Sequence, residues 1–289
     1  MIITNKYNLP QSFVEMAKEE HEVKEKEYRV TSLLKGVRET ILFRRHHQDI
    51  EKDVSDMIWL LFGKAVHNIL ENQQETDTEL KEERVKAKIG DYTISGKFDL
   101  YCEKEKKITD YKTASVWKII YQDYEDWRKQ LLIYAWIMRQ YGFEVKEGEV
   151  IALLKDHQKS KAKYDSNYPQ LPVYKKTFKF SEEDFLIIEN WLYMTFNLIE
   201  ESEKLQDNEL PICTEAERFN SGGKYAVIKT GRKTALKVFD NAEEADIWVS
   251  ENNKGDYIEY RPGEDKKCQD YCDINMFCSY YLEKEGRVS

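Results

Sequence analysis

The sequence predicts an α/β fold in which a central mixed sheet is flanked by helices. Apolar residues recur at helical spacing on both sides of a section whose period changes to two, the period of a strand. A further short apolar run, GEVIALLK, lies between two helical patterns and is typical of a buried strand. With 41% hydrophobic and 34% charged residues, the composition is that of a chain with a folded core and excludes a disordered one.

The individual elements follow from the local period of the apolar residues. Helical spacing predicts helices over residues 12–25, 31–45, 52–72, 123–141 and 181–206. Alternating or β-rich patterns predict strands over residues 83–89, 91–102, 106–112 and 148–155, and we expect the first three to be antiparallel. The last helix opens with SEED, a capping-box pattern. From residue 31 onward the predicted order is therefore α-α-β-β-β-α-β-α.

The C-terminal third reads as an added module. The segments KYAVIKT, TALKVF and DYIEYR are typical of strands, and NAEEADIWVSENN is typical of a helix after the second strand, which gives a ββαβ unit. We therefore expect three parts: a core over residues 1–212, a ββαβ insertion over residues 213–267 and a cysteine-rich segment over residues 268–289.

Charge and targeting signals narrow the setting. The formal net charge of −9 argues mildly against a nucleic-acid partner, although 45 lysines and arginines leave room for a local basic groove. No apolar run approaches the length of a bilayer span, and the first residues lack the pattern of a signal peptide. We expect a cytoplasmic chain that does not engage a membrane.

Two acidic residues and a lysine fall on neighbouring predicted strands. Asp99 ends the segment GKFD and Asp110 opens DYKT, so a hairpin would bring both carboxylates within reach of one cation. Lys112 follows Asp110 by two residues, which puts both side chains on the same face of the sheet. Such oxygens suit Mg²⁺ or Mn²⁺, which would polarise a phosphodiester. Alone, D-x-K is typical of a surface salt bridge, but an unpaired carboxylate in the apolar strand of Asp99 would be costly.

Side chains on two predicted helices complete the candidate site. His67 lies near the apolar stripe of the helix over 52–72, and a helix packed on the sheet would aim it at Asp99. A lone histidine on such a stripe is more often a core residue. Gln130 and Tyr134 lie one turn apart on the helix over 123–141, where Gln130 would hold a phosphate or Lys112. The alternative for both is a polar helix surface.

Taken in order, these motifs resemble a known family. The series G-x-x-x-H, G-x-x-D, I-x-D-Y-K-T and Q-x-x-x-Y is similar to the RecB-type branch of the PD-(D/E)XK nuclease superfamily over about residues 31–200. The residue before Asp99 is Phe98 where the superfamily's name has proline, a departure common in this branch. The resemblance implies a restriction-endonuclease-like core.

The resemblance also implies roles for single residues. It assigns metal binding, to Mg²⁺ or Mn²⁺, to His67, Asp99, Asp110 and the backbone carbonyl of Tyr111. It assigns catalytic roles to Lys112, Asp110 and Asp99, with Gln130 and Tyr134 as the trailing motif.

Four cysteines suggest a second metal centre. Cys213 is followed by the series Cys268-x₃-Cys272-x₅-Cys278, and four thiolates suit zinc or an iron–sulfur cluster. The arrangement resembles the iron–sulfur RecB-like nucleases, which include AddB and the CRISPR adaptation nucleases, and implies a [4Fe–4S] cluster. Here Cys213 follows the nuclease motifs and the first gap has three residues, two departures that keep a structural Zn²⁺ as the alternative. Free thiols in a small core are the remaining possibility.

Contacts to DNA are expected from basic residues near the site. The stretch KDHQKSKAK supplies Lys155, Lys159 and Lys161, and Arg45 lies on an early helix, although solvated loops explain such charges equally well. The 19 tyrosines and 6 tryptophans include candidates for stacking on bases.

Together these features predict a metal-dependent DNA exonuclease that acts on ends or single strands in DNA processing, recombination or repair. The resemblance is to phage-encoded members, which would place the protein in a host cytoplasm. Three alternatives stay open: a structure-specific endonuclease on the same site, a non-cleaving DNA-binding or adaptation subunit, and an iron–sulfur protein whose nuclease-like motifs are accidental.

Overall fold

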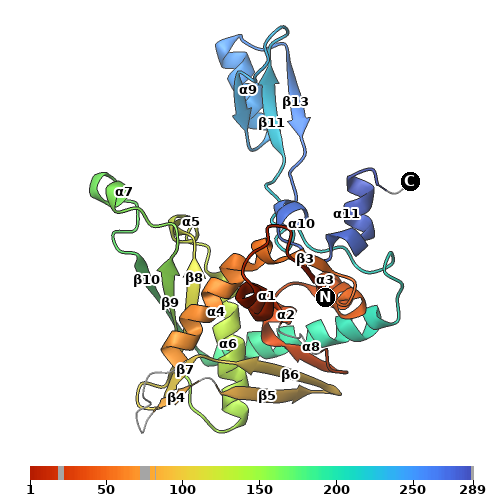
Figure 1. The fold of residues 1–289 in the computed structure, drawn as a ribbon. Helices are drawn as coiled ribbons and strands as arrows, with labels where there is room; N and C mark the ends of the chain where they lie inside the picture. Colours follow the sequence, from red (N-terminus) through yellow and green to blue (C-terminus); the bar gives the residue numbers. More distant parts are fainter. Residues whose placement is uncertain (19–22, 72–78, 82, 288–289) are drawn as a thin grey trace. The chain divides into compact units, whose positions relative to one another are not determined.

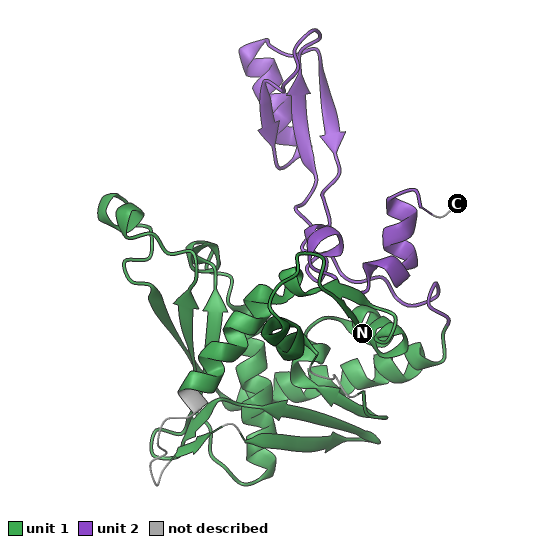
Figure 2. Cartoon of the chain, in the orientation of Figure 1, with its two compact units in different colours: residues 1–205 green, residues 206–289 purple. Residues whose placement is uncertain are grey.

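The chain divides into two compact units, which a computed structural model describes for residues 1–18, 23–71, 79–81 and 83–287. The first unit spans Met1–Leu205 and the second Gln206–Ser289 (Figure 2). The division falls a few residues before the position 212 expected from the sequence, and the three-part organisation remains a proposal. Among the described residues, no helix is both long and apolar enough to cross a membrane.

Helices and strands both occur along the whole of the first unit. Its helices are α1 (Gln11–Ala17), α2 (Val30–Leu33), α3 (Val37–His46), α4 (Ile58–Glu71), α5 (Val116–Ile120), α6 (Glu125–Gln140), α7 (Lys159–Tyr164) and α8 (Glu182–Glu203), with the 3-10 turn η1 (Val54–Met57). Its strands are β1 (Ile2–Thr4), β2 (Glu27–Arg29), β3 (Glu51–Asp53), β4 (Glu79–Lys81), β5 (Arg84–Ile89), β6 (Tyr92–Lys97), β7 (Leu100–Cys102), β8 (Lys107–Ala114), β9 (Glu147–Leu154) and β10 (Val173–Lys179).

A mixed sheet with packed helices confirms the predicted fold class. The five-stranded sheet has the order β10-β9-β8-β7-β4, in which β8 and β9 are parallel and the other pairs are antiparallel. Helix α6 packs against β8 and β9 and also against β5, while α4 packs on β8 and α8 packs on α3 and α6 (Figure 1). The fold thus presents β8, the strand of the DYKT motif, to helices α4 and α6.

The strand expected over residues 91–102 is two strands in different sheets. β6 pairs with β5 and with β2 in a three-stranded sheet, whereas β7 pairs with β8 and β4 in the five-stranded one. The chain changes sheets at Phe98 and Asp99, both of which are buried. The Asp99 carboxylate accepts a hydrogen bond from the Tyr111 backbone N–H at 2.6 Å. This N–H group of β8 is therefore bonded to a side chain and not to the backbone of a neighbouring strand. The predicted three-stranded meander is therefore wrong at this point.

Two predicted helices differ from those observed. The helix expected over 31–45 is broken into α2 and α3 at Gly36, whose φ of 98° is a backbone conformation that glycine adopts at low cost. The helix expected over 12–25 is the shorter α1, and residues 19–22 of that prediction lie outside the described residues. The helix over 52–72 begins later, as α4, after Asp53 caps η1 by accepting from the Ser55 backbone N–H at 3.0 Å; residue 72 lies outside the described part.

The later helices match the sequence patterns closely. Helix α6 is buried along most of its length because it lies between both sheets and α8. Helix α8 begins with a capping box in which Ser181 and Asp184 satisfy each other's backbone N–H groups. Strand β10 and helices α5 and α7 have no counterpart among the predicted elements.

A glycine sets how closely α6 approaches β6. A Cβ atom on Gly96 would lie 2.4 Å from Cε1 of Tyr134, and 3.0 Å from a methyl carbon of Val30. Real Cβ atoms do not approach other atoms so closely, so only glycine leaves space for the Tyr134 ring. This contact fixes the face of α6 that carries Gln130, one turn before Tyr134.

The second unit contains the predicted ββαβ module. Strands β11 (Lys224–Ile228), β12 (Lys237–Phe239) and β13 (Tyr257–Arg261) form an antiparallel sheet of order β12-β11-β13, and helix α9 (Ala242–Asn252) packs on β11 and β12. The tail adds α10 (Lys266–Asp270), the 3-10 turn η2 (Asn275–Phe277) and α11 (Ser279–Lys284).

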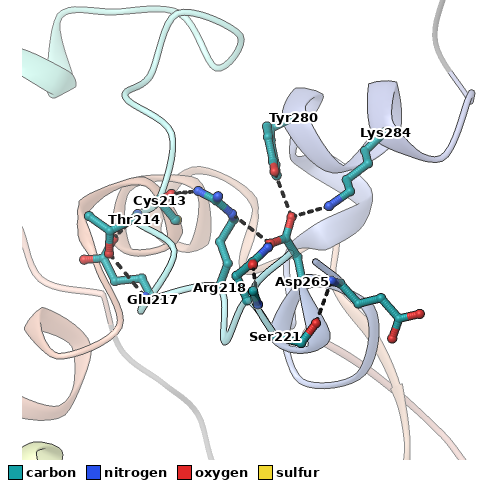
Figure 3. Close-up of polar contacts among 11 residues, drawn as sticks. Cys213, Thr214, Glu217, Arg218, Ser221, Asp265, Tyr280 and Lys284 are labelled. Atoms are coloured by element: carbon teal, nitrogen blue, oxygen red, sulfur yellow. Dashed lines mark hydrogen bonds and ion pairs between the residues drawn. The ribbon is translucent and has the colours of Figure 1, made fainter. Parts of the chain in front are cut away.

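Asp265 contacts both the segment that follows Cys213 and the C-terminal helix α11 (Figure 3). Its Oδ1 accepts from Arg218 Nε at 3.1 Å and Asn220 Nδ2 at 2.6 Å, and its Oδ2 accepts from Tyr280 Oη and Lys284 Nζ, each at 2.7 Å. Burial alone would raise the pKa of Asp265, but these donors outweigh it and hold the pKa well below its usual range. One buried carboxylate thus ties the segment after Cys213 to α11.

The close approach at Gly96 predicts opposite effects for two glycine-to-alanine changes. Gly96→Ala is expected to lower the free energy of unfolding by about 1–3 kcal/mol, because the added methyl overlaps the Tyr134 ring. Gly63→Ala, in helix α4, is the control: its Cβ would meet Thr113 Oγ1 at an ordinary 3.5 Å, and alanine favours a helix by up to about 1 kcal/mol. Denaturant unfolding of both variants measures the difference, and equal stability of Gly96→Ala and the wild type would contradict the packing described here.

The Asp265 contacts predict acid sensitivity of the second unit. Because the folded-state pKa lies below the unfolded value of about 3.9, the stabilisation is fully present above about pH 4 and is lost as the pH falls further. Asp265→Ala should cost on the order of 3 kcal/mol at neutral pH, since it leaves the Arg218 charge unpaired. Hydrogen exchange of residues 213–221 and 264–284 between pH 7 and 3 checks both effects. The exposed Asp270→Ala is the control, and unchanged exchange in Asp265→Ala would refute this role.

Candidate active site

Two carboxylates lie close together at the start of β7 and in the neighbouring strand β8. Asp99 immediately precedes β7 and Asp110 lies within β8. The two residues are 8% and 4% exposed. Asp99 is held by the Tyr111 backbone N–H, described above. The hairpin expected from the spacing of the two acids is therefore present, and it brings two negative charges into a buried space.

The helix α4 supplies an imidazole to this pair. His67 Nδ1 lies 3.2 Å from Asp99 Oδ1, and the His67 side chain is about one-third exposed. The contact with Asp99 raises the pKa of His67, while partial burial acts in the opposite direction. His67 is thus directed at the acid to which the sequence analysis assigned it, and it is not a residue enclosed in the apolar core.

Lys112 brings a positive charge to the second acid. Its Nζ lies 2.9 Å from Asp110 Oδ2 and donates to Gln130 Oε1 at 2.9 Å. The shared face expected from the two-residue period is therefore occupied by an ion pair. The Lys112 side chain remains 27% accessible to solvent, so the ion pair is not sealed in the core.

Gln130 holds the acid and the lysine together. Its Nε2 donates to Asp110 Oδ1 at 3.3 Å and to Tyr134 Oη at 3.1 Å, while its Oε1 accepts from Lys112. Burial raises the pKa of Tyr134 well above its usual range, so the hydroxyl stays neutral. The amide and the tyrosine therefore act as a buried support, in place of the polar helix surface considered as an alternative.

The Asp110 carboxylate is incompletely neutralised. Burial raises the pKa of Asp110, the nearby Asp99 charge adds to this effect, and the Lys112 ammonium opposes it. Asp110 Oδ2 is paired with the Lys112 ammonium at 2.9 Å and meets no other donor among the described residues. A buried carboxylate beside a second acid is costly even with one ammonium near it, and a cation ligated at its oxygens would lower the cost.

These donors suit a divalent cation of the hard type. Carboxylate oxygens of Asp99 and Asp110 and the imidazole of His67 are ligand types used by Mg²⁺, Mn²⁺ and related ions. In the described part of the chain no three His, Cys, Asp or Glu side chains already stand in metal-binding geometry. The carboxylates here face His67, Lys112 and a backbone N–H instead. A ligand role for the Tyr111 carbonyl stays a prediction.

The basic residues expected to contact DNA lie in different places. Lys155 follows β9, and its backbone N–H donates to the Ala114 carbonyl at 3.0 Å, at the end of β8. Lys159 and Lys161 lie on the exposed helix α7. Arg45 does not join this group. Its Nη2 donates to carbonyls at the C-terminal end of α8, those of Ser202, Glu203 and Leu205. This is a helix-capping contact, and a role of Arg45 in binding DNA stays a prediction.

The four cysteines of the second unit form no disulfide and are not gathered into a metal site among the described residues. Burial raises the pKa of the Cys268 thiol, and the nearby Asp265 and Cys278 add to the effect. The Cys213 carbonyl accepts a hydrogen bond from Arg218, which also binds Asp265 (Figure 3). Cys213 and the C-terminal cysteines therefore belong to one connected region, and the predicted cluster stays a prediction.

A hydrogen-bonded link between Asp156 and the start of α5 lies near the site and could hardly be recognised in the sequence. Asp156 accepts from Ser115 Oγ at 2.6 Å and from the Val116 backbone N–H at 2.8 Å, which fixes the start of α5 beside the end of β9. The serine and the aspartate are 41 residues apart, and neither belongs to a motif that spacing identifies. This link positions the aromatic residues of α5 next to the strand that carries Lys112.

Comparison with known proteins identifies the family. The PD-(D/E)XK nuclease superfamily matches residues 11–279, most of the chain. Among solved structures, one of a protein named SSO0001 is 15% identical, with a TM-score of 0.44 over 64% of this chain and 82% of the other. A phage-related exonuclease from Haemophilus somnus 129PT is 14% identical, with a TM-score of 0.29 over 66% of this chain and 83% of the other.

At these identities and TM-scores the two structures add nothing to the family match, and no curated protein matches the chain. The match over residues 11–279 covers every motif of the site described above. The chain belongs to the PD-(D/E)XK nuclease superfamily.

Proposed function

We propose that this nuclease hydrolyses phosphodiester bonds of DNA with Mg²⁺ or Mn²⁺, acting from ends or on single strands. The observation that carries this proposal is the buried Asp110 carboxylate, which lies beside a second acid, Asp99, and is paired with the ammonium of Lys112. An arrangement of this kind is unfavourable by itself and becomes favourable once a cation is held there.

Each residue of the site has a distinct part in this proposal. His67, Asp99 and Asp110 would hold the cation, which when bound polarises a phosphodiester and lowers the pKa of an attached water. Lys112 would contact the phosphate and counter the negative charge that develops during cleavage. Gln130 is a positioning residue, because it holds Lys112 and Asp110 at once.

Basic residues near the site support DNA as the substrate. Lys155, Lys159 and Lys161 supply positive charge on the segment that follows β9, and phosphate backbones bind to such groups without sequence preference. The net charge of −9 favours local over general attraction to nucleic acid. Exonucleolytic action, the pathway and the location in a cytoplasm remain parts of the proposal.

Cleavage assays test the hydrolase directly. Wild-type protein should cleave linear single-stranded DNA with Mn²⁺ or Mg²⁺ and not with EDTA. Asp110→Asn and Lys112→Ala should each lower the rate by about 100-fold or more, since they remove a metal ligand and a charge at the reacting phosphate. Glu183→Gln, an exposed acid on α8, is the matched control and should keep the wild-type rate.

The form of the DNA separates the related functions. Cleavage of linear DNA with sparing of closed circles supports an exonuclease, whereas nicking of circles indicates a structure-specific endonuclease. Absence of any metal-dependent cleavage, together with retained DNA binding, would reject the enzyme in favour of a non-cleaving DNA-binding subunit.

The cysteine region carries a separate proposal. We infer a [4Fe–4S] cluster held by Cys213, Cys268, Cys272 and Cys278, supported by the contacts that join Cys213 through Arg218 to Asp265, which lies near Cys268. Such a cluster would close the chain between Cys213 and the tail as a structural cross-link.

Anaerobically purified protein should therefore be brown, with absorbance near ~400 nm from cysteine-ligated iron. Cys272→Ser should lose the iron, whereas Cys102→Ser, a thiol of β7 in the first unit, should keep it. A colourless protein with one zinc per chain would replace the iron–sulfur cluster by structural Zn²⁺, and a metal-free folded protein would remove both.

A further inference from the structure

Exposed aromatic side chains form two pairs beside the candidate active site. On α4, Trp59 and Phe62 are 59% and 45% exposed, with ring centroids 6.3 Å apart and edge to face. Trp117 on α5 and Tyr121, the residue that caps its C-terminus, are 51% and 73% exposed, with rings stacked at 5.7 Å and 23° between their planes. Large apolar side chains that gather in solvent commonly mark a surface that binds something.

The first pair is on the helix that presents His67. Trp59, Gly63 and His67 follow at intervals of four residues, so they lie along one face of α4. At the middle of this row, a Cβ on Gly63 would touch Thr113 Oγ1 at 3.5 Å, one residue beyond Lys112. The row therefore passes over β8, with His67 on one side of the contact and Trp59 on the other.

The second pair begins three residues after Lys112. Strand β8 ends at Ala114, Ser115 caps α5, and Trp117 and Tyr121 follow one turn apart. The hydrogen bonds from Ser115 and Val116 to Asp156 hold this short helix to the end of β9. Both aromatic pairs therefore flank the end of β8 that carries the lysine of the site.

A lysine adds charge to this surface. Lys155 Nζ lies 4.5 Å from the centroid of the Trp59 ring, and its backbone N–H is bonded to Ala114. Two nearby carboxylates are engaged elsewhere, Asp156 with the start of α5 and Asp126 with Lys118 at 2.7 Å. Ring faces and an ammonium together match a ligand with flat apolar groups and a negatively charged backbone.

We propose that Trp59, Trp117 and Tyr121 stack on unpaired bases of the strand whose phosphodiester enters the site, with Lys155 contacting its phosphates. This inference rests on the proposed nuclease function and narrows its substrate to a single-stranded segment. In a duplex the faces of the bases are covered by neighbouring base pairs, whereas an unpaired base offers its face to a protein ring. The surface continues from the cleavage site, which favours nucleic acid over a protein partner.

Binding without metal tests this proposal separately from cleavage. Fluorescence anisotropy of a labelled oligothymidine in EDTA should show weaker binding by about 5- to 100-fold for each of Trp59→Ala, Trp117→Ala and Tyr121→Ala. Trp59→Phe should restore most of the affinity, because it keeps a ring. Tyr193→Ala, an exposed aromatic residue on α8, is the matched control and should bind as the wild type does. A blunt duplex should bind the wild type and the variants alike.

The outcomes distinguish the two proposals. Wild-type cleavage of DNA, together with alanine variants that bind oligothymidine as tightly as the wild type, would overturn the stacking surface and leave the nuclease intact. If the wild type cleaves no DNA but binds oligothymidine, and the alanine variants lose this binding, the stacking surface is supported and the nuclease is rejected. Equal loss of duplex and single-strand binding would overturn the stated preference for unpaired bases.

Discussion

A buried carboxylate is costly unless charged or hydrogen-bonding partners surround it, and at Asp110 this constraint brings together side chains from several elements of the first unit. Asp110 is 4% exposed, and its burial together with the nearby Asp99 charge raises its pKa. Lys112 on the same strand, Gln130 on α6 and His67 on α4 approach this pair from separate elements. The packing of α4 and α6 on β8 is what makes these contacts simultaneous.

The same constraint explains an irregularity of the sheets. The chain leaves β6 and enters β7 at Phe98 and Asp99, so Asp99 points its carboxylate to the Tyr111 N–H on β8. On the other side of the site, Gly96 leaves space for the Tyr134 ring, which supports Gln130 through a hydrogen bond. The change of sheets and the active-site residues therefore form one structural feature. The strand is interrupted at the point where the Asp99 carboxylate turns toward β8.

Local periodicity predicted what is local and failed where distant partners decide. The faces shared by Asp110 with Lys112 and by Gln130 with Tyr134 follow from spacings of two and four residues, and the structure has both. The edge strand β10 was missed because most of its residues are at least partly exposed, so VYKKTFK has no strong apolar alternation. Arg45 reaches carbonyls about 157 residues away, a pairing that no pattern contains. The Asp265 contacts in the second unit were hidden for the same reason.

Binding of a divalent cation by the buried acids decides whether the proposed hydrolysis can occur. The most direct measurement is anomalous scattering from crystals of the protein soaked in Mn²⁺. We expect one manganese peak bonded to oxygens of Asp99 and Asp110 and to the His67 imidazole, and its disappearance in Asp110→Asn crystals. A peak elsewhere, or none at saturating Mn²⁺ with the same side chains ordered, would contradict it.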